Sequence, residues 1–252
     1  MHKIAMITGA TSGIGYSTAV IFASNGWDVI ITGRRAEGLE KIAIELNDQY
    51  RVRILTLCFD VRNNEEVEAA IKGMPEEWQQ INVLVNNAGL ASGLMPIQQG
   101  NLLDWEKMID TNIKGLLYVS RVVSPLMIRN GKGHIINIGS IAGHEIYPNG
   151  NVYCGTKAAV ELITKGMRVD MLKDGIRVTL VSPGAVNTEF SVVRFHGDQP
   201  RADTVYNGYQ PLSGDDVAKV VWFAASLPPH INISEVTVVP TAQAGTNLVH
   251  RV

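Results

Sequence analysis

KIAMITGATSGIG, residues 3–15, is the stretch that decides the expected fold. Lys3 to Thr8 form a short apolar run typical of a buried strand, and the glycines that follow are spaced Gly9-x-x-x-Gly13-x-Gly15. At a turn from a strand into a helix, glycines let a phosphate group approach the backbone, where the helix N-terminus attracts its charge. The stretch therefore predicts the nucleotide-binding turn of a doubly wound sheet, with plain turn glycines as the alternative.

The rest of the chain alternates strand and helix patterns without hairpin turns, which indicates a parallel sheet with helices on both faces. The expected strands are residues 3–8, 28–32, 52–59, 83–85, 134–138, 178–181 and 236–239. A long helix is expected from about Asp104 to Arg129. Residues 184–211 lack periodicity, and we expect a loop that covers the binding site.

Composition excludes several classes of protein. With 252 residues, 46% hydrophobic and 18% charged, the chain is expected to form one packed domain, residues 1–252. A net charge of −2 and a pI near 6.3 argue against nucleic-acid binding. No apolar run reaches bilayer length, and Met1-His2-Lys3 leads directly into a strand, so we expect a cytoplasmic protein without a membrane contact. Cys58 and Cys154 are expected to be reduced, and no metal site is predicted.

A tyrosine and a lysine four residues apart form the second informative pattern, in NVYCGTK, residues 151–157. On a helix, Tyr153 and Lys157 lie on one face, one turn apart. A unit positive charge about 4 Å from a phenol, at an effective dielectric of about 20, is worth roughly 4 kcal/mol, or about three pKa units. The pair can thus supply a base near neutral pH, and Ser140 can hold the oxygen that exchanges the proton. Taken alone, the pattern also fits a core aromatic residue beside a solvated lysine.

Together, these motifs resemble the short-chain dehydrogenase/reductase superfamily over the whole chain, in the right order. The motifs are Thr8-Gly9-x-x-x-Gly13-Ile14-Gly15, Asn86-Asn87-Ala88-Gly89, Asn112, Ser140, Tyr153-x-x-x-Lys157 and Pro183-Gly184. The resemblance implies a single α/β domain with a Rossmann-type sheet of about seven strands, a nicotinamide cofactor and hydride transfer. Within the superfamily, the chain is similar to NADP-dependent serine or 3-hydroxy acid dehydrogenases. The features behind that narrower match are Thr32 to Arg35, Asp104-Trp105, Ile109 to Asn112, Thr188 to Ser191, Val193 to Phe195 and Leu227 to Ile233.

The resemblance also implies roles for individual residues. Tyr153 is the expected general acid/base, Lys157 lowers its pKa and holds the nicotinamide ribose, and Ser140 orients the substrate oxygen. Asn112 is expected to anchor a water between Lys157 and solvent, unless it only marks a local kink. The expected substrate contacts are Ser140, Tyr147, Tyr153 and Arg194. The expected cofactor contacts are Gly9, Thr11, Ser12, Gly13, Ile14, Gly15, Arg34, Arg35, Asp60, Val61, Asn87, Ala88, Gly89, Tyr153, Lys157, Pro183, Gly184, Val186 and Thr188.

Some of these positions have plainer explanations. Asp60 can bound the adenine or merely cap the next helix. Asn87 to Gly89 and Pro183-Gly184 can be ordinary turns. Residues 143–148 are expected to line the substrate pocket, but an acidic Glu145 there leaves the exact substrate open.

Cofactor choice depends on the residues after the second strand, because the adenosine ribose ends there. An acidic residue would bond the 2′-hydroxyl and repel a 2′-phosphate, whereas this chain has Gly33-Arg34-Arg35. We therefore predict NADP. The alternative is that both arginines only begin the next helix as solvated charges.

Arg194 lies in the expected covering loop, where it can bind a carboxylate with two charge-assisted hydrogen bonds or remain solvated. The predicted substrate is a small 3-hydroxy acid, such as serine, allo-threonine or 3-hydroxyisobutyrate, or its oxo counterpart. A superfamily reductase for a ketoacyl group, a sugar or a bulky ketone is the nearest alternative. A cofactor-sensing protein without catalysis is the alternative from another class.

Self-association is also expected. Leu116 to Val119 and Ala158 to Val160 offer more apolar surface than one sheet can cover. We predict a homotetramer of two-fold pairs, since the family resemblance implies helix-to-helix pairing at these two stretches.

Overall fold

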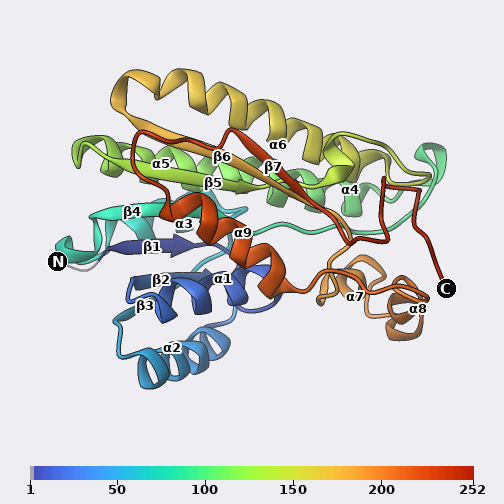
Figure 1. Ribbon diagram of the computed structural model, residues 1–252, viewed down its shortest axis with the longest axis horizontal. Helices are drawn as coiled ribbons and strands as arrows, with labels where there is room; N and C mark the ends of the chain where they lie inside the picture. The colour runs from blue at the N-terminus through green and yellow to red at the C-terminus, as the bar shows by residue number, and fades with distance from the viewer. Residues whose placement is uncertain (1–2) are drawn as a thin grey trace.

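A computed structural model describes residues 3–252, and its seven strands form one parallel sheet in the order β3-β2-β1-β4-β5-β6-β7 (Figure 1). The predicted α/β class with a doubly wound parallel sheet is confirmed. Met1 and His2, which the sequence indicates lead into the first strand, lie outside the described residues. The strands are β1 (Ile4–Ile7), β2 (Asp28–Gly33), β3 (Ile54–Cys58), β4 (Ile81–Asn86), β5 (Gly133–Ile138), β6 (Ile176–Pro183) and β7 (Glu235–Val238).

Helices cover both faces of this sheet (Figure 1). Successive side chains of a strand point to opposite faces, so Ala5 and Ile7 join one apolar core while Ile4 and Met6 join the other. The first core is closed by α1, α2 and α9, and the second by α3, α5 and α6. The helices are α1 (Gly13–Ser24), α2 (Ala36–Tyr50), α3 (Asn64–Lys72), α4 (Leu102–Ile109), α5 (Leu116–Arg129), α6 (Asn151–Asp170), α7 (Phe190–Arg194), α8 (Gln199–Thr204) and α9 (Gly214–Ser226).

The long helix expected from Asp104 to Arg129 is interrupted. A π-helical turn, Asp110–Gly115, separates α4 from α5. The turn contains Asn112, and its amide group bonds to the backbone of Leu90 on a different segment. Single π turns inside helices frequently occur at functional sites. Apolar periodicity does not reveal such a turn, because it inserts one residue without ending the helical pattern.

The covering segment between β6 and α9 also differs from expectation. The sequence predicts a loop without secondary structure there, and that prediction is wrong for residues 190–194 and 199–204, which form α7 and α8. Helices of five and six residues are shorter than the window in which helical periodicity can be recognised. We call residues 184–211 the lid.

Other predicted boundaries agree closely. The strand expected over 83–85 extends at both ends as β4. Cys58 and Cys154 are unpaired. Among residues 3–252, no helix combines the length and the hydropathy that crossing a membrane requires. Whether the domain spans all of residues 1–252 stays a prediction.

The strand order reverses direction between β1 and β4. At such a switch point the loops after neighbouring strands run to opposite sides, which opens a crevice at the carboxyl ends of the strands. The loops after β1, β4, β5 and β6 carry most of the residues singled out from the sequence.

Candidate active site

A cleft of about 680 Å³ lies at the carboxyl ends of the strands. It is lined by every site residue expected from the sequence except Gly15 and Asn112. Side chains from the lid, among them Arg194 and Tyr206, close one side of it. Apart from these two, the predicted cofactor residues and the predicted catalytic residues therefore line one continuous space.

The glycine turn after β1 adopts conformations that side chains disfavour. Gly9 and Gly13 have φ of +66° and +54°, in the left-handed region that favours glycine. Ser12 precedes α1 without a side-chain cap, and no acidic residue lies in the first turn of that helix. The helix N-terminus is thus open to an anion, as a bound pyrophosphate requires.

Gly15 acts from behind the cleft. A Cβ atom at this position would lie 2.3 Å from the carbonyl oxygen of Gly9 and 2.4 Å from Nδ2 of Asn87. Asn87 donates from that nitrogen to the carbonyls of Thr8 and Gly9, at 2.9 and 3.1 Å. Because Gly15 has no Cβ, the loop after β4 can form these hydrogen bonds with the loop after β1. The two loops are thereby held together at the base of the cleft.

Arg34 and Arg35 directly precede α2, and both line the cleft. Arg35 donates to Oγ1 of Thr11 at 3.4 Å, and neither arginine forms a close ion pair with a carboxylate of residues 3–252. Two cations without an anionic partner at the end of β2 fit a 2′-phosphate. Both arginines are exposed directly before α2, as the alternative of solvated charges also predicts, and their contact with the 2′-phosphate stays a prediction.

Asp60 lines the cleft close to these arginines. Its carboxylate pairs with Arg62 at 2.6 Å. The cap of α3 is Asn63, whose side chain accepts from the amides of Glu65 and Glu66. The helix-cap alternative for Asp60 is therefore wrong, and its contact with adenine stays a prediction.

Tyr153 lies in the first turn of α6 and is 9% exposed. Burial raises the pKa of Tyr153, while the charge of Arg194 and hydrogen bonding with Ser140 act in the opposite direction. Ser140 follows β5, and its Oγ accepts from the amide of Ala142 at 3.1 Å, which orients the hydroxyl. The phenol and the serine hydroxyl thus face one point in the cleft.

Lys157 follows one turn later on α6 and is 7% exposed. Its Nζ donates to the carbonyl of Ile138 at 2.9 Å. Burial lowers the pKa of Lys157 to about 8. In this structure, the cation that acts on Tyr153 is Arg194, and the predicted effect of Lys157 on the pKa of Tyr153 stays a prediction.

Asn112 approaches Lys157 from the π turn. Both Asn112 Oδ1 and Lys157 Nζ come close to Gly89, at 3.3 and 3.5 Å from where a Cβ would lie. The amide of Asn112 bonds to both backbone groups of Leu90 at 2.8 Å and to Oγ1 of Thr156 at 3.0 Å. The helix kink and the proximity to Lys157 thus occur together, and the anchored water stays a prediction.

Arg194, the last residue of α7, lies over three aromatic rings. Its Cζ is 5.1 Å from the ring centres of Tyr153 and Phe190, and 5.4 Å from that of Tyr147. It donates to the hydroxyl of Tyr147, while its Nε is buried without a hydrogen-bond partner. No carboxylate among residues 3–252 forms an ion pair with it. Arg194 therefore holds an uncompensated positive charge and a free donor beside Tyr153.

Glu145 does not line the cleft. Its Oε2 accepts from the amide of Thr246 at 2.9 Å, in the C-terminal segment. Of the stretch expected to line the substrate pocket, residues 143–148, Tyr147 alone is on the cleft wall. The carboxylate of Glu145, which left the substrate prediction open, thus binds the C-terminal segment and does not face the cleft.

The C-terminal segment, residues 240–252, was missed in the sequence analysis. It adds four residues to the cleft wall, and Arg251 donates to the carbonyls of Val205 and Asn207 in the lid. Gln243 accepts from the amide of Ala185 at 2.8 Å. No sequence motif marks these residues. They reach the cleft only because the chain returns to it after β7.

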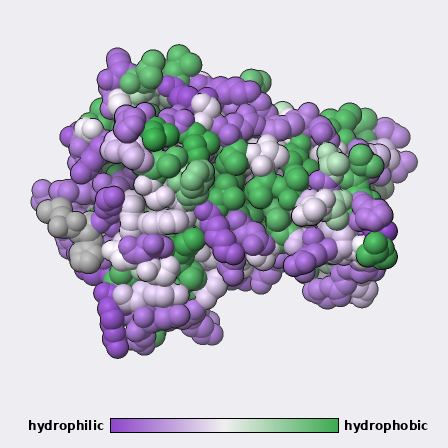
Figure 2. All heavy atoms as spheres, in the orientation of Figure 1, coloured by the Kyte–Doolittle hydropathy of each residue, from purple (hydrophilic) through white to green (hydrophobic). Residues whose placement is uncertain are grey.

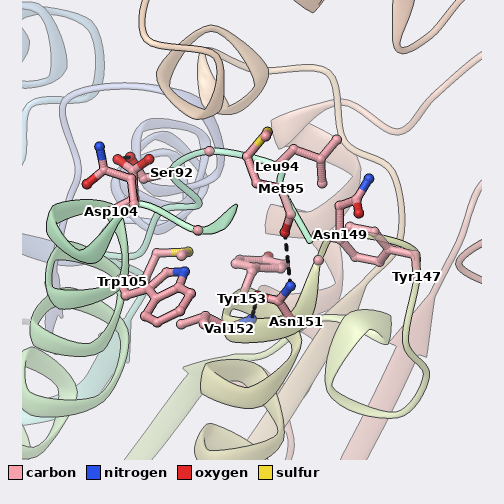
Figure 3. Close-up of a pocket in the computed structure, with 15 residues that line it drawn as sticks. Ser92, Leu94, Met95, Asp104, Trp105, Tyr147, Asn149, Asn151, Val152 and Tyr153 are labelled. Carbon is pink, nitrogen blue, oxygen red and sulfur yellow. Dashed lines mark hydrogen bonds between the residues drawn. The ribbon is translucent and has the colours of Figure 1, made fainter. Parts of the chain in front are cut away.

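A second, much smaller cavity adjoins Tyr153 (Figure 3). Its volume is about 20 Å³, close to what one water molecule needs. Trp105 and Tyr147 line it, and Asn151 donates to the carbonyl of Met95 at 3.0 Å across its wall. The loop that contains Met95 is tied to the lid, because the amide of Gly93 donates to the carbonyl of Arg194 at 2.9 Å.

Comparison with known proteins places this geometry in context. The family model described as short chain dehydrogenase matches residues 3–198. Sulfoacetaldehyde reductase 2 of Chromohalobacter salexigens is 46% identical over 97% of this chain and 96% of its own length. The NADP-dependent 3-hydroxy acid dehydrogenase YdfG of Salmonella typhi is 46% identical over 98% of this chain and 99% of its own.

A solved structure agrees at the level of the whole fold. The closed form of serine dehydrogenase complexed with NADP⁺ superimposes with a TM-score of 0.92 at 43% identity. The match covers 99% of this chain and 100% of the other. The segments outside the family match, residues 199–252, are therefore also shared with a solved relative.

Proposed function

Because the chain belongs to the short-chain dehydrogenase family and is an oxidoreductase acting on CH–OH groups, we propose that it oxidises a small 3-hydroxy acid, or reduces the matching oxo acid. NADP is the cofactor. The observation that carries the choice of substrate is Arg194, a cation with a free donor and no carboxylate partner among residues 3–252, beside Tyr153. A substrate with its own anion completes that site.

The residues of the cleft fit NADP. The open N-terminus of α1 and the left-handed Gly9 and Gly13 suit the pyrophosphate, and Arg34 with Arg35 suits the 2′-phosphate. When bound, the cofactor accepts or donates the hydride. The side chains at the other end of the cleft, Tyr153, Ser140 and Arg194, position the substrate and transfer its proton.

Proton transfer is assigned to Tyr153. During oxidation its hydroxyl oxygen takes the proton of the substrate hydroxyl, and during reduction it returns one. Ser140 donates to the same substrate oxygen and fixes it in place. Lys157, buried next to the cleft, supplies positive charge that favours the phenolate form of Tyr153.

Arg194 fixes the other end of the substrate. A 3-hydroxy acid carries its hydroxyl and its carboxylate on carbons separated by one more carbon, so Tyr153 and Arg194 can hold both groups at once. Clamping both ends removes orientational freedom before the chemical step. Phe190 and Tyr147, stacked around the guanidinium, exclude water from the pair and strengthen it.

A sulfonate substrate is the second candidate. Sulfoacetaldehyde places an aldehyde and a sulfonate at the same separation as the two ends of a short oxo acid, and a relative of this chain is named for its reduction. The guanidinium of Arg194 binds either anion with the same donors. Relative activity on the two acids therefore decides between the candidates.

The deciding experiment follows the near-ultraviolet absorbance of the reduced nicotinamide with NADP and with NAD. With the oxidised cofactors the panel contains serine, allo-threonine, 3-hydroxyisobutyrate, hydroxyethanesulfonate, a neutral short alcohol and a sugar. A bulky ketone is tested in the reverse direction with the reduced cofactors. We expect the highest kcat/KM for a short anionic substrate with NADP. Preference for a neutral or bulky substrate contradicts the proposal, and inactivity on every substrate points to the cofactor-sensing alternative.

The same proposal includes a homotetramer in the cytoplasm. Leu117 on α5 and Leu162 on α6 are 40% and 67% exposed, and Leu103 on α4 is 79% exposed. Figure 2 shows further apolar surface across the middle of the face that carries β7 and α9. A second copy covers such surface when helices pair. Light scattering at micromolar concentration is expected to give four times the monomer mass of 27.4 kDa, and a monomer mass contradicts it.

A further inference from the structure

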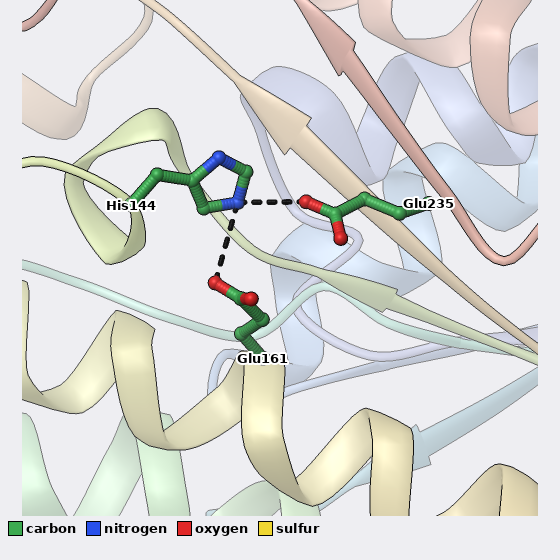
Figure 4. Close-up of side chains that lie close together, drawn as sticks. All are labelled: His144, Glu161 and Glu235. Carbon is green, nitrogen blue, oxygen red and sulfur yellow. Dashed lines mark ion pairs between the residues drawn. The ribbon is translucent and has the colours of Figure 1, made fainter.

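Three side chains that can bind a metal meet outside the cleft (Figure 4). Nε2 of His144 lies 2.8 Å from Oε1 of Glu235 and 3.4 Å from Oε2 of Glu161. All three ligand atoms lie within 4.8 Å of one another. They come from the turn after β5, from α6 and from β7, so tertiary structure alone brings them together.

The surroundings of these three side chains turn their ligand atoms toward one another. The other oxygen of Glu161, Oε1, accepts from Nζ of Lys165 at 2.5 Å, so Oε2 is the oxygen turned toward His144. Partners of this kind, which orient a ligand from outside, are typical of metal sites. The side chains of His144 and Glu235 are each 30% exposed, and that of Glu161 is 19% exposed, which leaves a path from solvent.

A fourth polar group points into the cluster from beneath. Ser182 on β6 is fully buried, and among residues 3–252 its hydroxyl has His144 Nε2 as its partner, at 3.5 Å. That distance is at the outer limit of a hydrogen bond. Ser182 therefore places a buried hydroxyl, with one long hydrogen bond, next to the imidazole nitrogen of the cluster.

We infer that His144, Glu161 and Glu235 form a binding site for one divalent cation of the zinc type. One imidazole and two carboxylates match the nitrogen and oxygen ligands that Zn²⁺ takes, with a solvent position left over. The two carboxylates balance the charge of the ion. This site is separate from the cleft, since none of its three residues lines the cleft wall.

The separation of His144 and Glu161 suits this assignment. With bonds of about 2.0–2.2 Å in tetrahedral geometry, ligand atoms lie roughly 3.3–3.5 Å apart. The separation of His144 Nε2 and Glu161 Oε2 already has this value, at 3.4 Å. The contact of His144 with Glu235, at 2.8 Å, is a hydrogen bond that the cation replaces when the imidazole proton leaves.

Binding at this site would join three elements. The amide of His144 closes the turn Ile141–Gly143, which follows Ser140 directly. The cation therefore ties the turn after Ser140 to α6 and to β7. Its effect on the protein is stabilisation of the folded state, because an unfolded chain does not present the three ligands together.

The test is a titration of metal-depleted, untagged protein with Zn²⁺ in a calorimeter, repeated with Co²⁺ to record the absorption of a tetrahedral site. We expect one ion per chain with a Kd on the order of 1 μM. At a concentration about 100-fold above Kd, Zn²⁺ is expected to raise Tm by roughly 5–10 °C. Absence of saturable binding by the wild-type protein overturns the inference.

Variants identify the ligands. His144→Gln and Glu235→Gln change side chains that are partly exposed, and both are expected to weaken Zn²⁺ binding by more than roughly 100-fold and to abolish the rise in Tm. His196→Gln is the matched control, because His196 also forms an imidazole–carboxylate contact, with Asp104 at 3.3 Å. Binding that survives in His144→Gln, or that is lost in His196→Gln, refutes the assignment. Circular dichroism verifies that each variant is folded.

Discussion

Lys157 and Arg194 both belong to the surroundings of Tyr153, and the structure holds them in opposite ways. Lys157 lies on the same helix as Tyr153, is almost fully buried and donates to the carbonyl of Ile138. Arg194 ends a five-residue helix of the lid and reaches Tyr153 across the cleft, over three aromatic rings. The first cation is fixed by local geometry, whereas the second depends on where the lid lies.

This difference suggests a division of labour. A lysine built into a helix next to the sheet is present at every stage of the reaction, so it suits the unchanging part of the chemistry. Arg194 lies on the lid and has a buried Nε without a hydrogen-bond partner, so its hydrogen bonding is satisfied only when an anion binds. We therefore expect Lys157 to act on all substrates and Arg194 on anionic substrates alone.

Removing the hydroxyl of Tyr153, the residue that both cations adjoin, is expected to have the largest effect on kcat. Tyr153→Phe is expected to lower kcat by at least ~10²- to 10⁴-fold, because general acid–base groups contribute that much. The affinity for NADP, measured by fluorescence or calorimetry, should stay near that of the wild type. Tyr50→Phe, on α2, is the control. Retention of more than about a tenth of the activity contradicts the role of Tyr153.

The buried cation comes next. Lys157→Met is expected to lower kcat on anionic and neutral substrates alike, by roughly 10²-fold, and to weaken NADP binding as well, since one ammonium serves both. Lys165→Met, two turns further along α6 and exposed, is the control. A loss confined to anionic substrates would mean that Lys157, rather than Arg194, binds the anion of the substrate.

The lid cation should act selectively. Arg194→Met is expected to lower kcat/KM on the hydroxy acid by roughly 10- to 150-fold, the value of a charged contact of about 1.5–3 kcal/mol. The corresponding alcohol without the acid group should change little. Arg201→Met is the matched control, because Arg201 is also a lid arginine stacked on a ring, at 4.2 Å from Phe195. Equal losses on both substrates indicate that Arg194 only shapes the lid.

A third cation extends the comparison to the other end of the cleft. Arg34→Asp is expected to reduce the preference for NADP over NAD by roughly 10-fold or more, because a carboxylate there repels a 2′-phosphate. The ratio of kcat/KM with the two cofactors measures the change, with Arg129→Asp as a control. If the wild-type protein uses NAD and NADP with equal kcat/KM, the predicted role of Arg34 is wrong.

The burial of Lys157 should also appear in the pH dependence of stability. The pKa of Lys157 is about 8 when folded, against ~10.4 in an unfolded chain. Between these values the unfolded chain binds more protons, so the cost of burying the charge is present below about pH 8 and is relieved as pH rises. The free energy of unfolding relative to Lys157→Met should rise by up to about 3 kcal/mol across this window.

Urea unfolding of both proteins at about pH 7 and about pH 10 measures the difference. Lys132→Met, which removes an exposed lysine, supplies the baseline for the general effect of pH. A difference that is flat across the window means that Lys157 stays charged in the folded protein, and that its bond to Ile138 outweighs burial.

Much of this protein was determined by short-range sequence pattern. Gly9, Gly13 and Gly15 allow a strand-to-helix turn that other residues resist, and the spacing of Tyr153 and Lys157 places them on one face of a helix. Strand and helix periodicity fixed the class of sheet. These features are local, since each depends on residues a few positions apart.

Tertiary structure decided the remaining features of the site, because these features depend on which distant segments of the chain come into contact. The π turn at Asn112 follows from bonds to Leu90, and the environment of Arg194 follows from rings on two other elements. Glu145 is drawn away from the cleft by Thr246, about a hundred residues later in the chain. The His144 cluster joins three elements in the same way. No periodicity or motif encodes such contacts, since they arise only when the packed sheet sets the distances between its loops.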